Sequence, residues 1–395
     1  MRMEFITLFF SITTTLTIFC SITIPVHSQC LEDQKSLLLQ LKNNLRFDSD
    51  SSVKLVNWAG TNDCCQWNGV TCDHFGRVIG LDLNTESISG GLNDSSSLFG
   101  LKFLEKLNLA NNSFNFAEIP SNKGTATLSV LNLQNNNFTG NIMGTFPKGC
   151  TLRTLELNGY NFEGEVPNSL ANCANAEVLN LGTNNINGIH NYLWPKLQII
   201  DLALNNFSGI LPPNFFSQRK AMMDGGNRQP NAKHLRFVFS KNIYYEDSVT
   251  VINKGLEMKL VKILTIFTII DFSNNSFKGK IPNTVGDLKS LYVLNLSHNA
   301  LTGSIPSSVG NLTQLGSLDL SWNKLGGKIP VTFACLTFLA FLNLSYNQLV
   351  GIIPTGPQLQ LFPNTSYEGN KGLWGPPLTA KEAEPAPPTL NSTQS

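Results

Sequence analysis

The 395-residue chain carries almost no net charge, because 28 lysines and arginines offset 27 aspartates and glutamates and leave +1 at pH 7. Proteins that bind nucleic acid normally carry a basic excess that neutralises phosphate groups. The charge balance therefore argues against nucleic acid as a partner.

Residues that could form a catalytic centre are also scarce. Apart from His27 near the N-terminus, the histidines are His74, His190, His234 and His298, which lie far apart in the sequence. No Gly-x-Ser-x-Gly nucleophile motif accompanies them. We therefore predict a protein that is not an enzyme and needs no cofactor.

Long hydrophobic runs are confined to the N-terminus. Arg2 gives a basic start, residues 5–24 are mostly apolar, and small residues follow. This order is typical of a secretory signal peptide, with an uncleaved membrane anchor as the alternative. The next most apolar stretch, 260–272, is too short to span a bilayer and contains Lys262. We predict a signal peptide over residues 1–28 and a secreted mature chain without a transmembrane segment.

One pattern is repeated three times in succession, starting at Leu291, Leu315 and Leu339 with a step of 24 residues. It reads Leu-x-x-Leu-x-Leu-x-x-Asn-x-Leu-x-Gly-x-Ile-Pro, and its period lies within the roughly 20–29 residues of leucine-rich repeats. The alternating leucines predict a short strand with one buried face, and the asparagine amide can satisfy backbone groups of adjacent coils. One unit cannot bury its own leucines, so we predict a solenoid of stacked repeats with a continuous core.

The repeats are predicted to form two arrays, six repeats over residues 77–213 and four over residues 266–355. Two positions of the repeat asparagine hold other residues, Glu86 in the first repeat and Tyr160 in the fourth. Tyrosine cannot supply an amide, so we expect a local defect at Tyr160.

An insertion over residues 214–265 interrupts the arrays. It has no leucine pattern and holds nine lysines and arginines against four acidic residues. Aromatic and β-branched residues between 237 and 252 favour an ordered insertion over the alternative, a disordered excursion. Such an insertion must fold over the surface of the solenoid, which favours a functional role.

Caps are expected at both ends, because a terminal repeat would otherwise expose its apolar face. Residues 29–76 are predicted to form the N-terminal cap, with a helix over 32–45 indicated by leucines at helical spacing. Residues 356–378 are predicted to form the C-terminal cap. The proline-rich tail, 379–395, is predicted to be disordered.

Seven cysteines follow the predicted signal peptide, and in an oxidising compartment they should pair. Cys335 is the expected unpaired cysteine. A zinc site in the cap is the disfavoured alternative, because no histidine pair lies nearby. The cysteines predicted to form disulfides are Cys30, Cys64, Cys65, Cys72, Cys150 and Cys173.

Acceptor sequences for N-glycosylation are abundant, and their density in a secretory chain favours glycosylation more than any single site would. Asn295 and Asn343 are expected at outward strand positions, where a glycan would occlude part of the concave face. The predicted acceptors are Asn93, Asn111, Asn137, Asn206, Asn274, Asn295, Asn311, Asn343, Asn364 and Asn391.

Large aromatic residues recur at one outward position of the last repeats. His298, Trp322 and Tyr346 occupy equivalent positions, and Tyr292 and Phe341 are expected beside them. Aromatic side chains on neighbouring strands can form an interaction hot spot. The alternative is that this position merely tolerates bulk next to the turn.

Several of these features together resemble the ectodomain of plant leucine-rich-repeat receptor-like proteins of the disease-resistance type. They are the cap motif over 64–72, an insertion followed by four repeats, the Gly-Asn-x-Gly-Leu sequence over 369–373, and Tyr245 separated by eight residues from Lys254-Gly255. The resemblance covers nearly the whole chain after the signal peptide. It implies a plant-type solenoid of short parallel strands with 3-10 or irregular segments on the convex side, coiled as a right-handed superhelix.

The resemblance also implies a function. It implies a non-catalytic module of the apoplast or cell surface that binds a peptide or pathogen-derived ligand and the ectodomain of a co-receptor kinase. Tyr245, Lys254 and Gly255 would take part in ligand sensing, and the aromatic positions would contact the co-receptor. The family usually has more repeats before the insertion, a cysteine where this chain has Trp374, and a membrane anchor. We therefore predict that the chain is a shortened or decoy form of such a receptor-like protein.

A secreted inhibitor of pathogen polygalacturonase is the alternative function. Such inhibitors share the cap, the 24-residue repeats and about this number of repeats, but their array is uninterrupted. The insertion and its Tyr245, Lys254 and Gly255 therefore favour the receptor-like interpretation.

Overall fold

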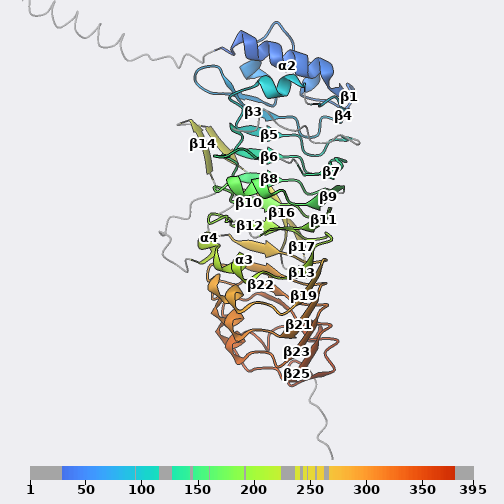
Figure 1. Cartoon of the computed structure of the whole chain (residues 1–395), viewed down its shortest axis with the longest axis vertical. Helices are drawn as coiled ribbons and strands as arrows, with labels where there is room; N and C mark the ends of the chain where they lie inside the picture. Colours follow the sequence, from blue (N-terminus) through green and yellow to red (C-terminus); the bar gives the residue numbers. More distant parts are fainter. Residues whose placement is uncertain are drawn as a thin grey trace, which may run out of the picture.

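The computed structural model is an elongated stack of coils with a helical cap at its N-terminal end (Figure 1). Within the described residues, no helix combines the length and apolar character needed to cross a membrane. The predictions for residues 1–28, Tyr160, Lys254, Gly255, Asn391 and residues 379–395 lie outside those residues. The structure describes residues 29–93, 95–114, 127–142, 146–159, 161–190, 193–223, 236–240, 243–246, 248–253, 256–261 and 267–378.

A main sheet runs the length of the stack. Its first two strands are antiparallel and the others are parallel, with equivalent residues in register, such as Leu294 beside Leu318. The order is β2 (Val70–Cys72), β3 (Val78–Asp82), β5 (Lys106–Asn108), β6 (Val130–Asn132), β8 (Thr154–Glu156), β10 (Val178–Asn180), β12 (Ile199–Asp201), β18 (Ile269–Asp271), β20 (Val293–Asn295), β22 (Ser317–Asp319) and β24 (Phe341–Asn343).

Shorter sheets and 3-10 helices complete the coils. The inward leucines of every coil, together with phenylalanines such as Phe114 and Phe138, whose rings stack at 5.1 Å, form one continuous core. The prediction of a leucine-rich-repeat solenoid is confirmed. The remaining elements of the coils are β4 (Ile88–Gly90), β7 (Gly140–Asn141), β9 (Phe162–Glu165), β11 (Asn185–Gly188), β13 (Ser208–Ile210), β19 (Ser276–Gly279), β21 (Ala300–Ser304), β23 (Lys324–Gly327), β25 (Gln348–Ile352), β26 (Gly372–Trp374), η3 (Ser97–Gly100), η5 (Asn168–Asn172), η6 (Asn283–Asp287), η7 (Ser307–Asn311), η8 (Val331–Cys335) and η9 (Asn364–Ser366).

The repeat asparagines bind each coil to the one before it. The amide nitrogen of Asn323 donates to the carbonyl of Leu296 in the preceding coil at 2.9 Å, and its oxygen accepts from the backbone N–H of Leu301 at 3.0 Å. These bonds are buried, and the C-terminal cap continues the series. The ladder consists of Asn112, Asn136, Asn184, Asn205, Asn275, Asn299, Asn323, Asn347 and Asn370.

The N-terminal cap closes the first coil. Helix α2 (Glu32–Asn44) buries Leu38 and Leu41, and the side chain of Gln34 accepts from the N–H of Val78 at 2.7 Å. Beside it lie β1 (Arg46–Phe47), η1 (Leu55–Asn57) and η2 (Cys64–Gln66).

Glu86 stands where the ladder would need an asparagine in the first coil, and it is 1% exposed. Its carboxylate accepts from the backbone N–H of Lys54 at 3.0 Å and of Leu55 at 3.1 Å, and from the hydroxyl of Ser52 at 2.5 Å. The neighbour on this side is the cap, which presents N–H groups rather than a carbonyl. An acceptor-only side chain is therefore the suitable residue here.

The insertion leaves the main sheet unbroken, because Asp201 of β12 is in register with Asp271 of β18. Residues 213–223 still belong to the coil, since α3 (Pro213–Ser217) and α4 (Lys220–Met223) bury Phe215, Phe216 and Met222. Beyond them, two antiparallel hairpins are described. They are β14 (Arg236–Ser240) with β15 (Ile243–Glu246), and β16 (Ser248–Asn253) with β17 (Leu256–Val261).

Candidate recognition surface

Three of the predicted aromatic side chains stack on one another at the C-terminal ends of successive strands. The rings of His298 and Trp322 lie 5.4 Å apart at an interplanar angle of 12°, and those of Trp322 and Tyr346 lie 4.1 Å apart at 19°. Trp322 is 49% exposed and Tyr346 39% exposed. We call these three residues the aromatic ladder.

The aromatic ladder occupies backbone positions that disfavour bulky residues. The residue before each repeat asparagine turns the chain inward with a positive φ, 52° at both His298 and Trp322 and 53° at Tyr346. Asparagine adopts this conformation readily, and Asn111 and Asn274 hold it at equivalent positions. Other side chains, Leu204 among them, hold the same φ in earlier coils, so the turn itself imposes this conformation. The last repeats differ in that three consecutive aromatic side chains stack there.

The ladder ends at the C-terminal cap. Gly369 occupies the next equivalent position, and a Cβ there would meet the ring of Tyr346 at 2.7 Å. Glu368 lies beside the Tyr346 hydroxyl, and its negative charge and hydrogen bond raise the pKa of that phenol. Tyr346 also lines a cavity of about 310 Å³ with Phe341 and Phe362.

The structure does not bring every predicted site residue together. Phe341 lies near Tyr346, but Tyr292 packs against Phe267, with ring centroids 4.8 Å apart, in a separate apolar cluster that includes Val293. Tyr245 lies in β15, in register with Phe237.

Burial distinguishes the predicted glycosylation sites. The side chain of Asn295 is 8% exposed and donates to a carboxylate oxygen of Asp271 at 3.1 Å, and Asn343 donates in the same way to Asp319 at 3.3 Å. A glycan on either amide nitrogen would have to replace that bond. The exposed acceptors are Asn93, Asn111, Asn137, Asn206, Asn274, Asn311 and Asn364.

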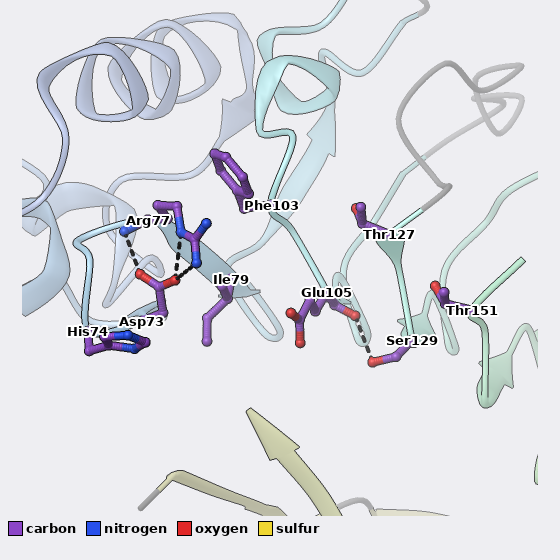
Figure 2. Close-up of a pocket in the computed structure, with 9 residues that line it drawn as sticks. All are labelled: Asp73, His74, Arg77, Ile79, Phe103, Glu105, Thr127, Ser129 and Thr151. Atoms are coloured by element: carbon purple, nitrogen blue, oxygen red, sulfur yellow. Dashed lines mark hydrogen bonds and ion pairs between the residues drawn. The ribbon is translucent and has the colours of Figure 1, made fainter. Parts of the chain in front are cut away.

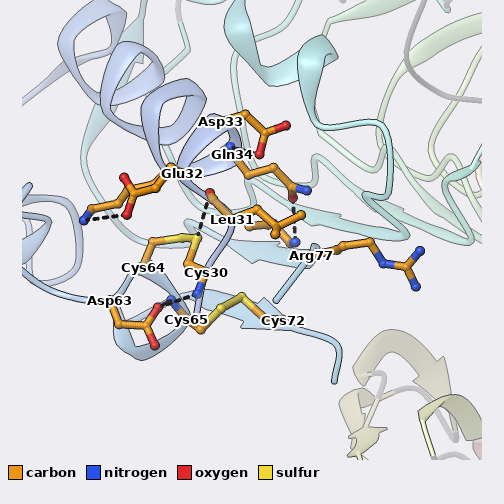
Figure 3. The surroundings of a disulfide bond; sticks show 12 residues. Cys30, Leu31, Glu32, Asp33, Gln34, Asp63, Cys64, Cys65, Cys72 and Arg77 are labelled. Atoms are coloured by element: carbon orange, nitrogen blue, oxygen red, sulfur yellow. Dashed lines mark hydrogen bonds and ion pairs between the residues drawn. A yellow bond between two sulfur atoms is a disulfide. The ribbon is translucent and has the colours of Figure 1, made fainter. Parts of the chain in front are cut away.

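All six cysteines of the prediction form disulfides, and Cys335 is free and exposed. Figure 3 shows that the four cap cysteines lie together, with Asp63 accepting from the N–H groups of Cys30 and Cys65 at 2.9 and 3.1 Å. Their sulfurs are bonded in pairs, which leaves no thiolate for zinc in this cluster. The pairs are Cys30–Cys64, Cys65–Cys72 and Cys150–Cys173.

Two buried carboxyls meet where the insertion joins the main sheet. Burial, reinforced by the neighbouring charge of Asp271, raises the pKa of Asp201 from 3.8 to about 8. Burial raises the pKa of Asp271 to about 6, opposed by hydrogen bonds from Ser273 and Asn295. Asp201 therefore retains its proton to a higher pH than Asp271 does.

We expect Asp201→Asn to remove much of the pH dependence of stability. The folded chain holds these protons to a higher pH than the unfolded chain, so the free energy of unfolding falls as pH rises from about 4 to 8. Compared with the unsubstituted chain, the variant should lose less of its free energy of unfolding between pH 5 and pH 8, by on the order of 2 kcal/mol. Urea unfolding across this range measures it, with the exposed Asp287→Asn as the control. Equal pH dependence in Asp201→Asn and the unsubstituted chain would contradict the expectation.

A second cavity, of about 430 Å³, lies at the N-terminal end of the main sheet, beside β3, β5 and β6 (Figure 2). Sequence reasoning missed it, because its residues come from separate coils and carry no motif. We call it the N-terminal cavity; it is lined by Asp73, His74, Arg77, Ile79, Phe103, Glu105, Thr127, Ser129 and Thr151.

Charges in the N-terminal cavity are partly compensated. Arg77 bonds Asp73 at 2.5 and 2.7 Å, and its guanidinium lies 4.8 Å from the ring centre of Phe75 and 4.6 Å from that of Phe103. Burial, and then the negative charge of Asp73, raise the pKa of Glu105.

Family models match the chain in the regions that form the cap and the coils. Residues 31–73 match the leucine rich repeat N-terminal domain, and residues 289–349 match the leucine rich repeat. Further leucine rich repeat matches cover 127–148, 196–217 and 267–288. These matches agree with the leucine-rich-repeat solenoid that the fold shows.

The chain is homologous to receptor-like proteins of Arabidopsis thaliana. It is 42% identical to Receptor-like protein 35 over 127 residues, which is 31% of this chain and 13% of that protein. It is 42% identical to Receptor-like protein 43 over 120 residues, 30% of this chain and 16% of that protein. The matched segment is thus a small part of these relatives.

Solved structures of plant proteins share the fold. A plant ice-binding protein has a TM-score of 0.69 and 25% identity, with 90% of this chain and 99% of that chain covered. The peptide hormone receptor RGFR1, solved with RGF2, has a TM-score of 0.51 and 25% identity over 74% of this chain and 44% of its own. The ectodomain of the Arabidopsis receptor kinase HAESA, solved with an IDA peptide hormone, has a TM-score of 0.53 and 23% identity over 87% and 58%.

Proposed function

We propose that the chain is a non-catalytic extracellular recognition module that binds a peptide or pathogen-derived ligand and the ectodomain of a co-receptor kinase. Its homology to receptor-like proteins supports this role, as do the related receptors solved with peptide hormones. The single observation that carries the proposal is the aromatic ladder, three stacked side chains held at strained backbone positions.

The aromatic ladder is the proposed contact with the co-receptor. Tryptophan and tyrosine are enriched among the residues that dominate protein interfaces, because they bury a large area at little cost in side-chain freedom. Tyr346 lines the cavity at the last strand together with Phe341, and the exposed ring of Trp322 stacks on Tyr346, so a partner could bury both rings.

Tyr245, Lys254 and Gly255 are proposed to contribute to ligand sensing from the insertion. Tyr245 lies in the first hairpin, and positions 254–255 connect the paired residues Asn253 and Leu256 of the second. An insertion outside the repeat pattern can contribute ligand contacts without altering the coils.

We expect Trp322→Asn to weaken capture of co-receptor kinase ectodomains at least about tenfold without destabilising the fold. Asparagine suits the positive φ that Trp322 adopts and removes only the exposed ring. Secreted full-length chain should be used as bait in plant extracts, with affinity then measured by surface plasmon resonance on the kinase ectodomain recovered. Thermal unfolding monitors stability.

Phe338→Ala is the matched control, because Phe338 is a 63% exposed aromatic residue outside the ladder. Equal affinity of Trp322→Asn and the unsubstituted chain would exclude the ladder as the contact. Capture of a polygalacturonase without any kinase ectodomain would reject the receptor-like role and favour the inhibitor alternative.

A further inference from the structure

We propose that the N-terminal cavity binds a basic side chain, arginine in preference to lysine, of the peptide ligand. This inference rests on the proposed function, because it names the chemistry of the ligand that the module would recognise. It assigns the ligand contact to the first coils, far along the stack from the aromatic ladder (Figure 1).

The carboxylate of Glu105 is the proposed anchor. Arg77 is held against Asp73 by the ion pair and lies between two phenylalanine rings, so it is not positioned to pair with Glu105. Among the described residues, Glu105 has no ion pair and its carboxylate accepts no hydrogen bond. The positive charge of Arg77 favours the charged form of Glu105 through space without pairing with it. A partly exposed carboxylate with no ion pair of its own at the wall of a cavity attracts a cationic group.

The hydroxyl groups of the cavity are oriented as acceptors. Thr127 donates its proton to the carbonyl of Leu104 at 2.8 Å, Ser129 to that of Glu105 at 3.1 Å, and Thr151 to that of Leu128 at 2.9 Å. A hydroxyl that has donated its one proton can only accept further bonds. The cavity therefore presents a carboxylate and a row of acceptor oxygens.

This arrangement calls for a ligand rich in hydrogen-bond donors. The guanidinium group of arginine has five N–H donors in a plane, whereas lysine offers three from one point. Phe103, which is 40% exposed, provides an apolar wall for the methylene stem of such a side chain. Figure 2 shows Glu105 between Phe103 and Ser129, so one arginine could contact both the anchor and an acceptor hydroxyl.

Binding of position-fixed peptide libraries tests the proposal. Acetylated, amidated octapeptides carry arginine, lysine, leucine or glutamate at one position and mixtures elsewhere, and their retention on the immobilised full-length chain is measured. We expect the arginine libraries to be retained at least about fivefold more than the leucine libraries, with lysine between them. Glu105→Gln should reduce that preference to near one while leaving retention of the leucine libraries unchanged.

Control variants separate this proposal from the proposed function. Trp322→Asn should leave the arginine preference intact, and Glu105→Gln should leave capture of the kinase ectodomain in the absence of peptide unchanged. Equal retention of arginine and leucine libraries, or a preference that survives Glu105→Gln, would overturn the assignment of the cavity. Faster proteolysis of the basic insertion in Glu105→Gln without any peptide would also overturn it, because the occupant would then be the chain itself.

Discussion

Replacing Asn323 by alanine should destabilise the protein by roughly 2 kcal/mol, since it would leave a buried main-chain N–H of the preceding coil without an acceptor. The amide nitrogen donates to the carbonyls of Leu296, Leu320 and Ser321, and the amide oxygen accepts from the N–H of Leu301. A buried donor left without a partner costs about 1–3 kcal/mol, and here the Leu301 N–H loses its acceptor, whereas the Leu296 carbonyl keeps the amide of Asn299 at 3.2 Å.

Urea unfolding of the full-length chain measures this loss, and Asn311→Ala is the matched control. Asn311 is an exposed asparagine at the end of η7, which precedes Asn323 in the chain. Its replacement should change the free energy of unfolding by less than about 0.5 kcal/mol. A loss of stability in Asn323→Ala as small as in this control would show that the hydrogen bonds of the repeat asparagines add little to the stability that the packed leucines provide.

Replacing Glu86 by alanine should cost somewhat more, roughly 3 kcal/mol, and should act on the cap. Its carboxylate accepts from two backbone N–H groups and one hydroxyl of the cap, and all three donors would lose their acceptor. Urea unfolding should measure the loss of stability, and hydrogen exchange should show reduced protection of the amides around η1. Asp287→Asn again serves as an exposed acidic control.

A second substitution at the same position makes the prediction sharper. Glu86→Asn introduces the residue found at this position in most other repeats, yet we expect it to destabilise the chain nearly as much as alanine does. The shorter amide would lie further from the N–H groups of Lys54 and Leu55, and its own N–H₂ group would face donors. If Glu86→Asn were as stable as the unsubstituted chain, an adapted contact between cap and coil would be excluded.

The two proposed recognition surfaces lie at opposite ends of the solenoid. The aromatic ladder is near the C-terminal cap, and the N-terminal cavity is formed by the cap and the first repeats. A solenoid couples such regions only through its neighbouring coils. Substitutions at one surface should therefore leave binding at the other unchanged.

The solenoid, its period and its disulfide-forming cysteines could all be predicted from the sequence. Each coil interacts chiefly with its neighbours, so a 24-residue spacing of leucines already defines which side chains are buried. The same spacing placed His298, Trp322 and Tyr346 in one row, and the structure adds only that their rings stack and that their backbone is strained.

The tertiary structure decided what depends on packing between segments that are not equivalent. Tyr292 was expected beside the aromatic ladder, but it packs against Phe267 instead. Glu86 looked like a departure from the pattern, and only the position of the cap shows why a carboxylate belongs there. Glu105 belongs to no motif, because its cavity exists only where the cap loop and the first coils meet. A repeat can be recognised from sequence spacing alone. Contacts at the ends and at the insertion depend on how segments of different sequence pack together, which that spacing does not predict.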